Sequence, residues 1–330
     1  MIEPIFQKAR DNNIPIAVLI ELTYRCNLDC QHCYVIHDQA QNELSTKEYY
    51  ELFDSLAKLQ TLFLTISGGE PFIRKDLKEL IIYATKKNFS IRLFTSGTLL
   101  NNDWGNFLRE MNILEIETSI YGADPTTHDR MTRISGSFDN LMKGLEILSK
   151  NKIKTNVKFI VTKNNYTQAK EIKQFVEELG FNFYYDVILT PKDNLDTTPQ
   201  QLSLSEKEMR EFYRLIDYKV NPIDREKEEY ICNAGVATMA ISPDGEVYPC
   251  VQLRKSAGNI RAESLKNIWD KGKIFQRLRE SRIKDYKCGS CPLLNYCSPC
   301  IGLIDMETGD INGCSETNKL RATIIKERYE

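Results

Sequence analysis

The ten cysteines of this 330-residue chain fall into two groups, and this distribution constrains the fold more than any other sequence feature. Cys26, Cys30 and Cys33 form a CxxxCxxC pattern near the N-terminus, and no further cysteine occurs before Cys232. The seven others lie between Cys232 and Cys314. No secretory signal is visible, so the close spacings favour thiolates that bind metal over disulfide bonds.

The segment between the two groups has the pattern of parallel β/α units. From residue 16 to about residue 217, short β-branched or aromatic runs alternate with amphipathic stretches. Ser45 with Glu48 and Asp76 with Glu79 have the spacing of helix capping boxes. Six units predict an α/β fold, namely a partial (β/α)6 barrel of the TIM type rather than a full barrel of eight. The expected strands are residues 16–22, 62–67, 91–95, 114–120, 157–161 and 183–189.

The C-terminal third has a different sequence pattern. Residues 236–241 and 246–250, joined by Pro243-Asp244-Gly245, predict a hairpin. A helix is expected over about residues 264–280, followed by a compact cysteine-rich stretch and a final helix from residue 317. We therefore expect two domains, a partial barrel over 1–220 and a cysteine-rich domain over 221–330.

The charge balance excludes several classes of partner. Lysine and arginine number 44 against 46 acidic residues, and neither sign forms a long block. This argues against a nucleic-acid or membrane surface. The apolar run over residues 14–20 is too short to span a bilayer, so a cytoplasmic protein is expected.

The first cysteine group follows the first predicted strand, at the end where β/α folds bind ligands. Thiolates of Cys26, Cys30 and Cys33 can hold three irons of a cubane and leave the fourth iron open. A structural zinc site is the alternative, with His32 or His37 as the fourth ligand.

A second motif, Gly68-Gly69-Glu70-Pro71, comes directly after the second predicted strand. Its two glycines permit close backbone approach, and its carboxylate can bind an amine. An ordinary turn has the same residues. Its position behind the strand next to the cysteine loop favours a joint ligand site.

Residues 26–34 (CNLDCQHCY) and Gly68-Gly69-Glu70-Pro71 together resemble the radical S-adenosylmethionine (SAM) superfamily, and the resemblance extends over about residues 14–217. It implies a [4Fe–4S] cluster on the three cysteines, whose open iron chelates the amino and carboxylate groups of SAM. Gly68, Gly69 and Glu70 would bind that amino group. Reduction of the cluster would then cleave SAM and release a 5′-deoxyadenosyl radical, with a flavodoxin- or ferredoxin-like protein as the reductant.

The same resemblance implies further contacts to the ribose and carboxylate of SAM from later strands. The candidates in this chain are Ser96, Ser119 and Arg133. Each has a simpler interpretation, because serines commonly end strands and a loop arginine is commonly solvated. His128 stands alone in its loop and is expected to be structural or solvated.

The seven later cysteines resemble the SPASM domain of radical SAM enzymes that modify peptides and proteins. The resemblance implies two auxiliary [4Fe–4S] clusters, although two residues rather than three separate Cys297 from Cys300. No extra cysteine is available for the first auxiliary cluster, which implies an open iron or a ligand other than cysteine. Two zinc ribbons are the alternative. The first cluster would take Cys232, Cys250 and Cys300, and the second Cys288, Cys291, Cys297 and Cys314.

These assignments use all ten cysteines, so no thiol remains to give a hydrogen atom to a substrate radical. This argues against a peptide epimerase and favours a reaction in which an auxiliary cluster accepts an electron. We expect a radical SAM oxidoreductase or maturase that modifies a ribosomally synthesised peptide. A substrate thiolate at an open auxiliary iron would favour a thioether over other crosslinks.

Only twenty-five residues precede Cys26, too few for the winged-helix module with which many relatives bind a leader peptide. A separate leader-peptide-binding protein would then deliver the peptide. Alternatively, the enzyme matures a protein subunit or a cofactor of the haem or quinone type. Sulfatase maturation fits less well, since that family has the extra cysteine. From a different class, a non-catalytic zinc-stabilised binding protein is the remaining alternative.

Overall fold

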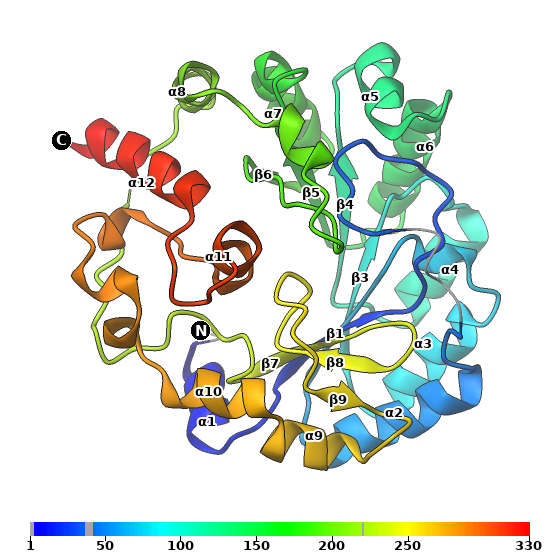
Figure 1. The fold of residues 1–330 in the computed structure, drawn as a ribbon. Helices are drawn as coiled ribbons and strands as arrows, with labels where there is room; N and C mark the ends of the chain where they lie inside the picture. Colours follow the sequence, from blue (N-terminus) through cyan, green and yellow to red (C-terminus); the bar gives the residue numbers. More distant parts are fainter. Residues whose placement is uncertain (1–2, 37–41, 220) are drawn as a thin grey trace.

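A computed structural model describes residues 3–36, 42–219 and 221–330 of the chain (Figure 1). Its first six strands are parallel and adjacent in chain order, which confirms the predicted partial barrel. They are β1 (Ala17–Glu21), β2 (Phe63–Ser67), β3 (Ser90–Thr95), β4 (Glu115–Ile120), β5 (Thr155–Ile160) and β6 (Asn182–Asp186).

Alternate side chains of these strands face a layer of helices and form the main core. In β2, for example, Leu64 and Ile66 are fully buried, whereas Thr65 between them is partly exposed. The helices cover the outer face of the sheet (Figure 1). They are α2 (Thr46–Lys58), α3 (Leu77–Lys86), α4 (Asn102–Glu110), α5 (Pro125–Thr132), α6 (Ser137–Lys150), α7 (Ala169–Glu178) and α8 (Glu206–Leu215).

The predicted C-terminal hairpin is present and also extends the barrel sheet. β7 (Thr238–Ile241) pairs antiparallel with β8 (Glu246–Tyr248), and β8 pairs with β9 (Gly258–Asn259). β7 also pairs in parallel with β1. A single nine-stranded sheet therefore crosses the division between residues 220 and 221, which we keep as a proposal.

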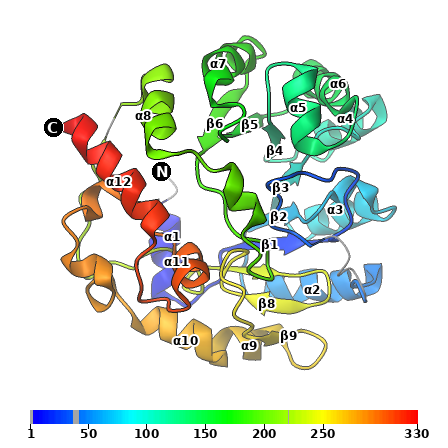
Figure 2. The ribbon, with the colours of Figure 1, turned by 45° about the horizontal axis from the view of Figure 1, so that its top comes forward.

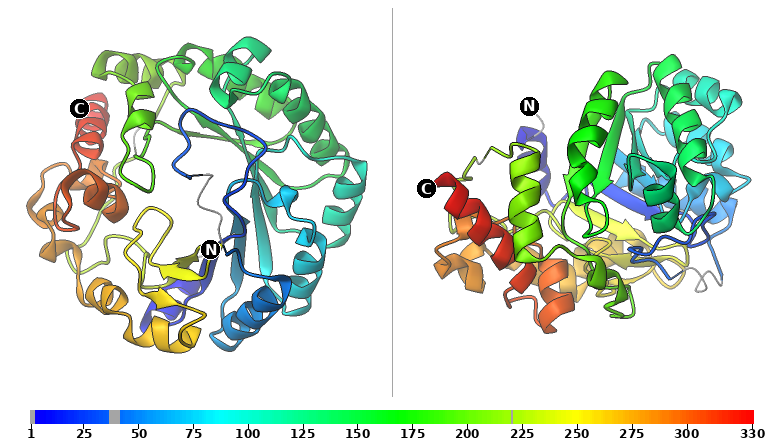
Figure 3. Two further views of the ribbon diagram at one scale, coloured as in Figure 1. Left: turned by 45° about the vertical axis from the view of Figure 1, so that its right-hand side comes forward. Right: turned by 90° about the horizontal axis from the view of Figure 1, so that it is seen from above.

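The rest of the C-terminal part occupies the open side of the barrel, between β6 and β9 (Figure 3). Helix α12 lies beside α8 (Figure 2), where Nε of Arg321 donates to the Tyr213 hydroxyl at 3.2 Å. The helices here are α9 (Leu265–Lys271), α10 (Lys273–Glu280), α11 (Ile301–Thr308) and α12 (Glu316–Tyr329), and α1 (Glu3–Asp11) precedes β1. Short 3-10 turns are Pro71–Ile73, Tyr166–Gln168, Thr198–Leu202, Ile283–Asp285, Lys287–Ser290 and Leu294–Tyr296.

Two local predictions are wrong. The single helix over 264–280 is two helices, because Gly272 between them has an extended ψ of 121°. The Ser45 capping box is present, but the Asp76 side chain does not cap α3. Its carboxylate instead binds Arg74 at 2.7 Å and the Thr46 hydroxyl at 2.7 Å.

Among the described residues, none of the helices has the length and apolar content needed to cross a bilayer.

Candidate active site

The first cysteine group and the glycine motif line one cavity of about 200 Å³ at the carboxyl ends of β1 to β4. This end is where parallel β/α folds bind ligands. The structure thus brings together most of the residues that the sequence singled out. Those that line the cavity are Cys26, Cys30, Cys33, Gly68, Gly69, Ser96 and Ser119.

The three thiols are partly buried in this cavity, and none forms a disulfide. Burial raises the pKa of Cys26 to about 11 and that of Cys33 to about 12, and the pKa of Cys30 is raised further by burial and by its two neighbours. Such thiols ionise at neutral pH only where a bound cation compensates for burial. Three convergent thiols therefore fit the iron cluster that the resemblance implies.

The glycine motif packs against the cysteine loop through its backbone. Amide nitrogens of Gly69 and Glu70 donate to the carbonyls of Thr23 at 2.7 Å and Arg25 at 2.9 Å. A Cβ on Gly68 would lie 2.3 Å from the Thr23 carbonyl oxygen, and one on Gly69 would lie 2.3 Å from that of Arg25. Both positions therefore require glycine for this contact, independently of any ligand.

Glu70 does not line the cavity. Its carboxylate is fully buried and accepts hydrogen bonds from Thr95 Oγ1, from both the amide and the hydroxyl of Ser96, and from the Phe72 amide. The pKa of Glu70 is raised by burial, against the effect of these donors. We therefore assign Glu70 to fixing the end of β3 beside the glycine turn, and its contact with a SAM amine stays a prediction.

The other three candidates differ in position. Ser96 lies in the cavity wall with its hydroxyl on Glu70 at 2.6 Å, and Ser119 lies on the β4 wall. Arg133 follows α5 in a left-handed conformation, is half exposed, and pairs with Asp29 at 3.1 Å. It is not brought to the cavity, and its role as a ligand contact is not supported by this geometry.

The chain contains three histidines. His32 lines the cavity, where burial lowers its pKa to about 4 and its Nδ1 has no hydrogen-bond partner. His128 is buried in α5 and accepts from the Tyr121 amide at 3.3 Å, as expected of a structural histidine. His37 lies outside the described residues. Within the described ranges, no three His, Cys, Asp or Glu side chains are close enough to hold a single metal ion.

The sequence did not single out a buried ion cluster beside this cavity. Arg254, in the loop after β8, binds both oxygens of Glu21 at 2.8 and 2.9 Å and lies 2.7 Å from Asp193. It also donates to the Tyr24 hydroxyl at 2.9 Å. Glu21 ends β1, so the sequence did offer one signal for this cluster, a carboxylate at the end of an apolar strand. It offered no signal for Arg254 or Asp193.

A second unforeseen pair lies in the cavity wall. Glu117 of β4 lines the cavity and binds Lys158 of β5 at 2.8 Å. Both side chains are partly buried. Both residues lie in predicted strands, where successive side chains alternate between the two faces, so the sequence could have indicated that they face inward.

The later cysteines gather at two places, and their division into two ligand sets stays a prediction. In the first set, the charges of Cys250 and Cys300 add to burial in raising the pKa of Cys232 to about 12. These thiols come from the loop before β7, the loop after β8 and the start of α11, and Cys300 Sγ lies 3.0 Å from Gln252 Oε1. The second set lines one pocket and consists of Cys288, Cys291, Cys297 and Cys314.

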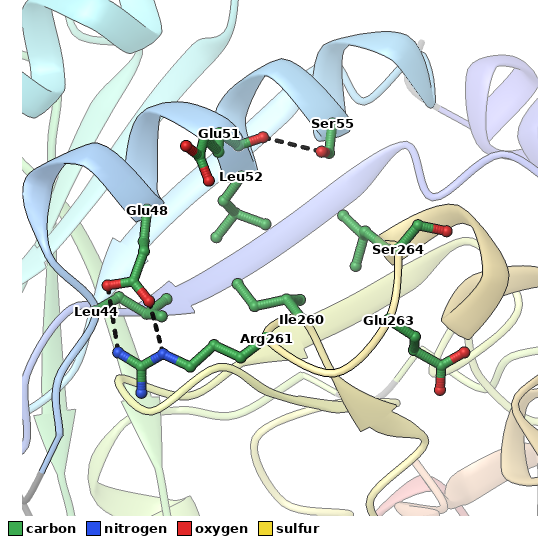
Figure 4. Close-up of a pocket in the computed structure, with 10 residues that line it drawn as sticks. Leu44, Glu48, Glu51, Leu52, Ser55, Ile260, Arg261, Glu263 and Ser264 are labelled. Atoms are coloured by element: carbon green, nitrogen blue, oxygen red, sulfur yellow. Dashed lines mark hydrogen bonds and ion pairs between the residues drawn. The ribbon is translucent and has the colours of Figure 1, made fainter.

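A further hollow of about 380 Å³ lies between α2 and the segment joining β9 to α9 (Figure 4). Leu44, Leu52 and Ile260 line it, and Arg261 faces Glu48 across its edge with a contact of 2.6 Å. No cysteine lines it. We interpret it as the seam that holds the C-terminal segment on the barrel.

Comparisons with known proteins agree with both cysteine groups. The sequence pattern of the Radical SAM superfamily matches residues 20–179. That of SPASM, an iron-sulfur cluster-binding domain, matches residues 232–292. Three cysteines lie beyond this second match, namely Cys297, Cys300 and Cys314.

Relatives span nearly the whole chain. The AdoMet-dependent heme synthase of Methanosarcina barkeri is 28% identical, and the match covers 90% of this chain and 94% of the synthase. The mycofactocin maturase MftC of Mycolicibacterium smegmatis is 28% identical, covering 88% of this chain and 79% of its own. The crystal structure of Streptococcus suis SuiB bound to S-adenosylmethionine has a TM-score of 0.74 at 17% identity, and the match covers 94% of this chain and 79% of SuiB.

Proposed function

Because the chain is a radical SAM enzyme with a SPASM domain and belongs with the maturases of that superfamily, we propose that it oxidatively modifies a ribosomally synthesised peptide. The preferred product is a thioether, with another crosslink as the wider class. In this proposal Cys26, Cys30 and Cys33 hold the SAM-binding [4Fe–4S] cluster. When bound, that cluster and SAM supply an electron and a carbon-centred radical that abstracts hydrogen.

The residues of this chain bind and orient these groups. Gly68 and Gly69 let the cavity wall pack directly on the backbone of the cysteine loop, and Ser96 and Ser119 offer hydroxyls on that wall. Glu70 keeps Ser96 in place through two hydrogen bonds.

One observation carries the oxidative assignment. The first auxiliary set contains three thiols, and Cys300 borders a hollow of about 350 Å³ at the carboxyl end of β6. This is the same end of the sheet as the SAM cavity. A peptide lying across the mouth would reach both sites, so a substrate thiolate can occupy the free position beside Cys232, Cys250 and Cys300.

The product would be two hydrogens lighter than the peptide. One hydrogen atom leaves the attacked carbon for the SAM-derived radical, and the thiol loses a proton as sulfur bonds to that carbon. One electron is left over, and the auxiliary clusters that the later cysteines would hold could accept it, so an oxidative outcome is favoured over a redox-neutral one.

A second candidate is maturation of a haem-type cofactor. The observation that favours it is the coverage of the heme synthase relative, which matches 90% of this chain. A tetrapyrrole would then take the place of the peptide at the same mouth.

The test uses protein purified and reconstituted without oxygen. About twelve irons per chain, three cubanes of four, would support three clusters, whereas zinc without iron would support the scaffold alternative. The enzyme is then incubated with SAM, dithionite and either the small peptides encoded beside its gene or carboxylated tetrapyrroles. A peptide product two hydrogens lighter supports the proposal. Turnover of tetrapyrroles alone would replace it with the second candidate.

A further inference from the structure

The side chain of Arg321 in α12 is held by a tyrosine rather than by an acid. Its Nε donates to the Tyr213 hydroxyl at 3.2 Å. Among the described residues, no carboxylate lies within ion-pair distance of its guanidinium. Two other largely buried arginines, Arg74 and Arg254, each have two carboxylates within 4 Å.

This guanidinium lines the hollow beside the first auxiliary set. The hollow has a volume of about 350 Å³ and a polar lining on the side of the C-terminal domain. Arginine there has five donors, of which only Nε–H has a hydrogen-bond partner among the described residues. The polar residues that share the lining are Asp186, Thr190, Gln252, Ser298 and Cys300.

We propose that Arg321 binds a carboxylate of the substrate in this hollow. The inference rests on the proposed function, because it assigns a recognition group to the peptide at the same mouth. A planar guanidinium with both terminal nitrogens free matches a carboxylate in a bidentate geometry. The carboxylate would stand where Arg74 and Arg254 have their own acidic partners.

Asp186 narrows the class of anion. It ends β6, lines the same hollow, and uses Oδ1 to accept from the Ile188 amide at 2.9 Å. Its negative charge disfavours a dianion such as phosphate, whereas it can accept an N–H from a peptide that carries a single carboxylate. The source of that carboxylate is either the C-terminus of the peptide or an acidic side chain.

Arg321 also has a neighbour in the second auxiliary set, since its charge acts to lower the pKa of Cys297. A purely structural or cluster-tuning arginine would change the signal of that cluster when it is replaced. A substrate-binding arginine would change peptide affinity and leave the cluster signal in place. The experiment therefore measures both quantities.

The first measurement needs no variant. Reconstituted wild-type enzyme is treated with phenylglyoxal in the presence of butyrate or of butyramide, its neutral analogue, and adducts are mapped by mass spectrometry. We expect butyrate alone to slow modification of Arg321 severalfold. Exposed Arg109 serves as the internal control and should react equally in both. Equal rates at Arg321 would overturn the proposal.

The second measurement identifies the source of the carboxylate. Labelled octapeptide pools with a free C-terminus, with a C-terminal amide, or with an amide and no acidic residue are compared for binding by anisotropy. In R321Q we expect about tenfold weaker binding of the carboxylate-bearing pool, about 1.4 kcal/mol, with partial recovery in R321K. R328Q on the same helix is the matched control, since Arg328 is exposed and bonds only the Tyr218 carbonyl.

Altered cluster spectra in R321Q with unchanged peptide affinity would assign Arg321 to the second auxiliary site and refute the proposal. The two proposals also fail separately. If Arg321 is protected by carboxylates but no peptide loses two hydrogens, the proposed function falls and the carboxylate site stands. If peptides are modified regardless of Arg321 and of their carboxylates, the proposed function stands and the carboxylate site is refuted.

Discussion

Replacing Arg254 by glutamine removes the one cation that Glu21 and Asp193 share. Glu21 is fully buried and the Asp193 side chain is 12% exposed, so R254Q leaves two buried carboxylates without their partner. Breaking a buried ion pair from one side costs about 3–5 kcal/mol. With an unfolding entropy of about 2.1 cal/mol/K per residue, a chain of 330 residues loses about 1.4 °C of melting temperature per kcal/mol. We therefore expect R254Q to lower the midpoint by about 4–7 °C.

The effect should also depend on pH. Burial already raises the pKa of Asp193 to about 6 and raises that of Glu21, and Arg254 opposes both shifts. Without the arginine both values rise further above those of the unfolded chain. A raised carboxyl pKa means that the folded state holds protons that the unfolded state has lost, so stability falls as pH rises. The difference between R254Q and wild type should be larger at pH 8 than at pH 6.

The assay is thermal unfolding of the reconstituted protein under nitrogen, with iron content measured on each sample. R261Q is the matched control, because Arg261 belongs to a nearby, more exposed pair with Glu48 and should change the midpoint by at most about 1.5 °C. The double variant E21Q/R254Q should recover part of the loss. If R254Q lowers the midpoint no more than R261Q, or equally at both pH values, the buried cluster does not stabilise the fold as argued.

Three further predictions concern the SAM cavity. C30A should abolish formation of 5′-deoxyadenosine and remove about four of about twelve irons, as measured by chromatography and iron analysis, while auxiliary signals persist. G69A should lose SAM binding in equilibrium dialysis, since its Cβ would lie 2.3 Å from the Arg25 carbonyl oxygen. In the control G136A the Cβ meets no atom within 4 Å, so this change should lower the stability of the fold by only about 1 kcal/mol because of the positive φ. E70Q should destabilise the protein by about 1–3 kcal/mol, because its amide nitrogen would face hydrogen-bond donors. A loss of SAM affinity without any loss of stability would instead indicate that Glu70 contacts the ligand directly.

The sequence predicted the six-stranded barrel and the cysteine groups because both depend on local signals. Apolar periodicity marks each strand, and the cysteine spacings are short. The pairing of β7 with β1 had no such signal, since Thr238–Ile241 is four residues long and its partner lies more than two hundred positions away. Pairing between distant segments depends on the tertiary fold, which a single sequence does not display.

Side-chain direction was the other limit. Glu70 was expected to bind an amine and Arg133 was a candidate by resemblance, yet the carboxylate turns to Ser96 and the guanidinium turns to solvent-facing Asp29. Ser96 and Ser119, also candidates by resemblance, do line the cavity. Strand position is fixed by the backbone, whereas a long charged side chain has several rotamers and selects the partner that the fold supplies.

The β1–β7 pairing connects the two loops that the proposed reaction would use. β1 leads into the cysteine loop of the SAM cavity, and β8, which pairs with β7, leads to Cys250 and Arg254. Arg254 then binds Glu21 at the end of β1, so the sheet and the ion cluster both fix Cys250 relative to Cys33. A rigid separation between two redox sites suits a reaction in which hydrogen leaves at one site and an electron arrives at the other. An arginine that merely filled a gap at the surface would not need to be buried or to bind two carboxylates.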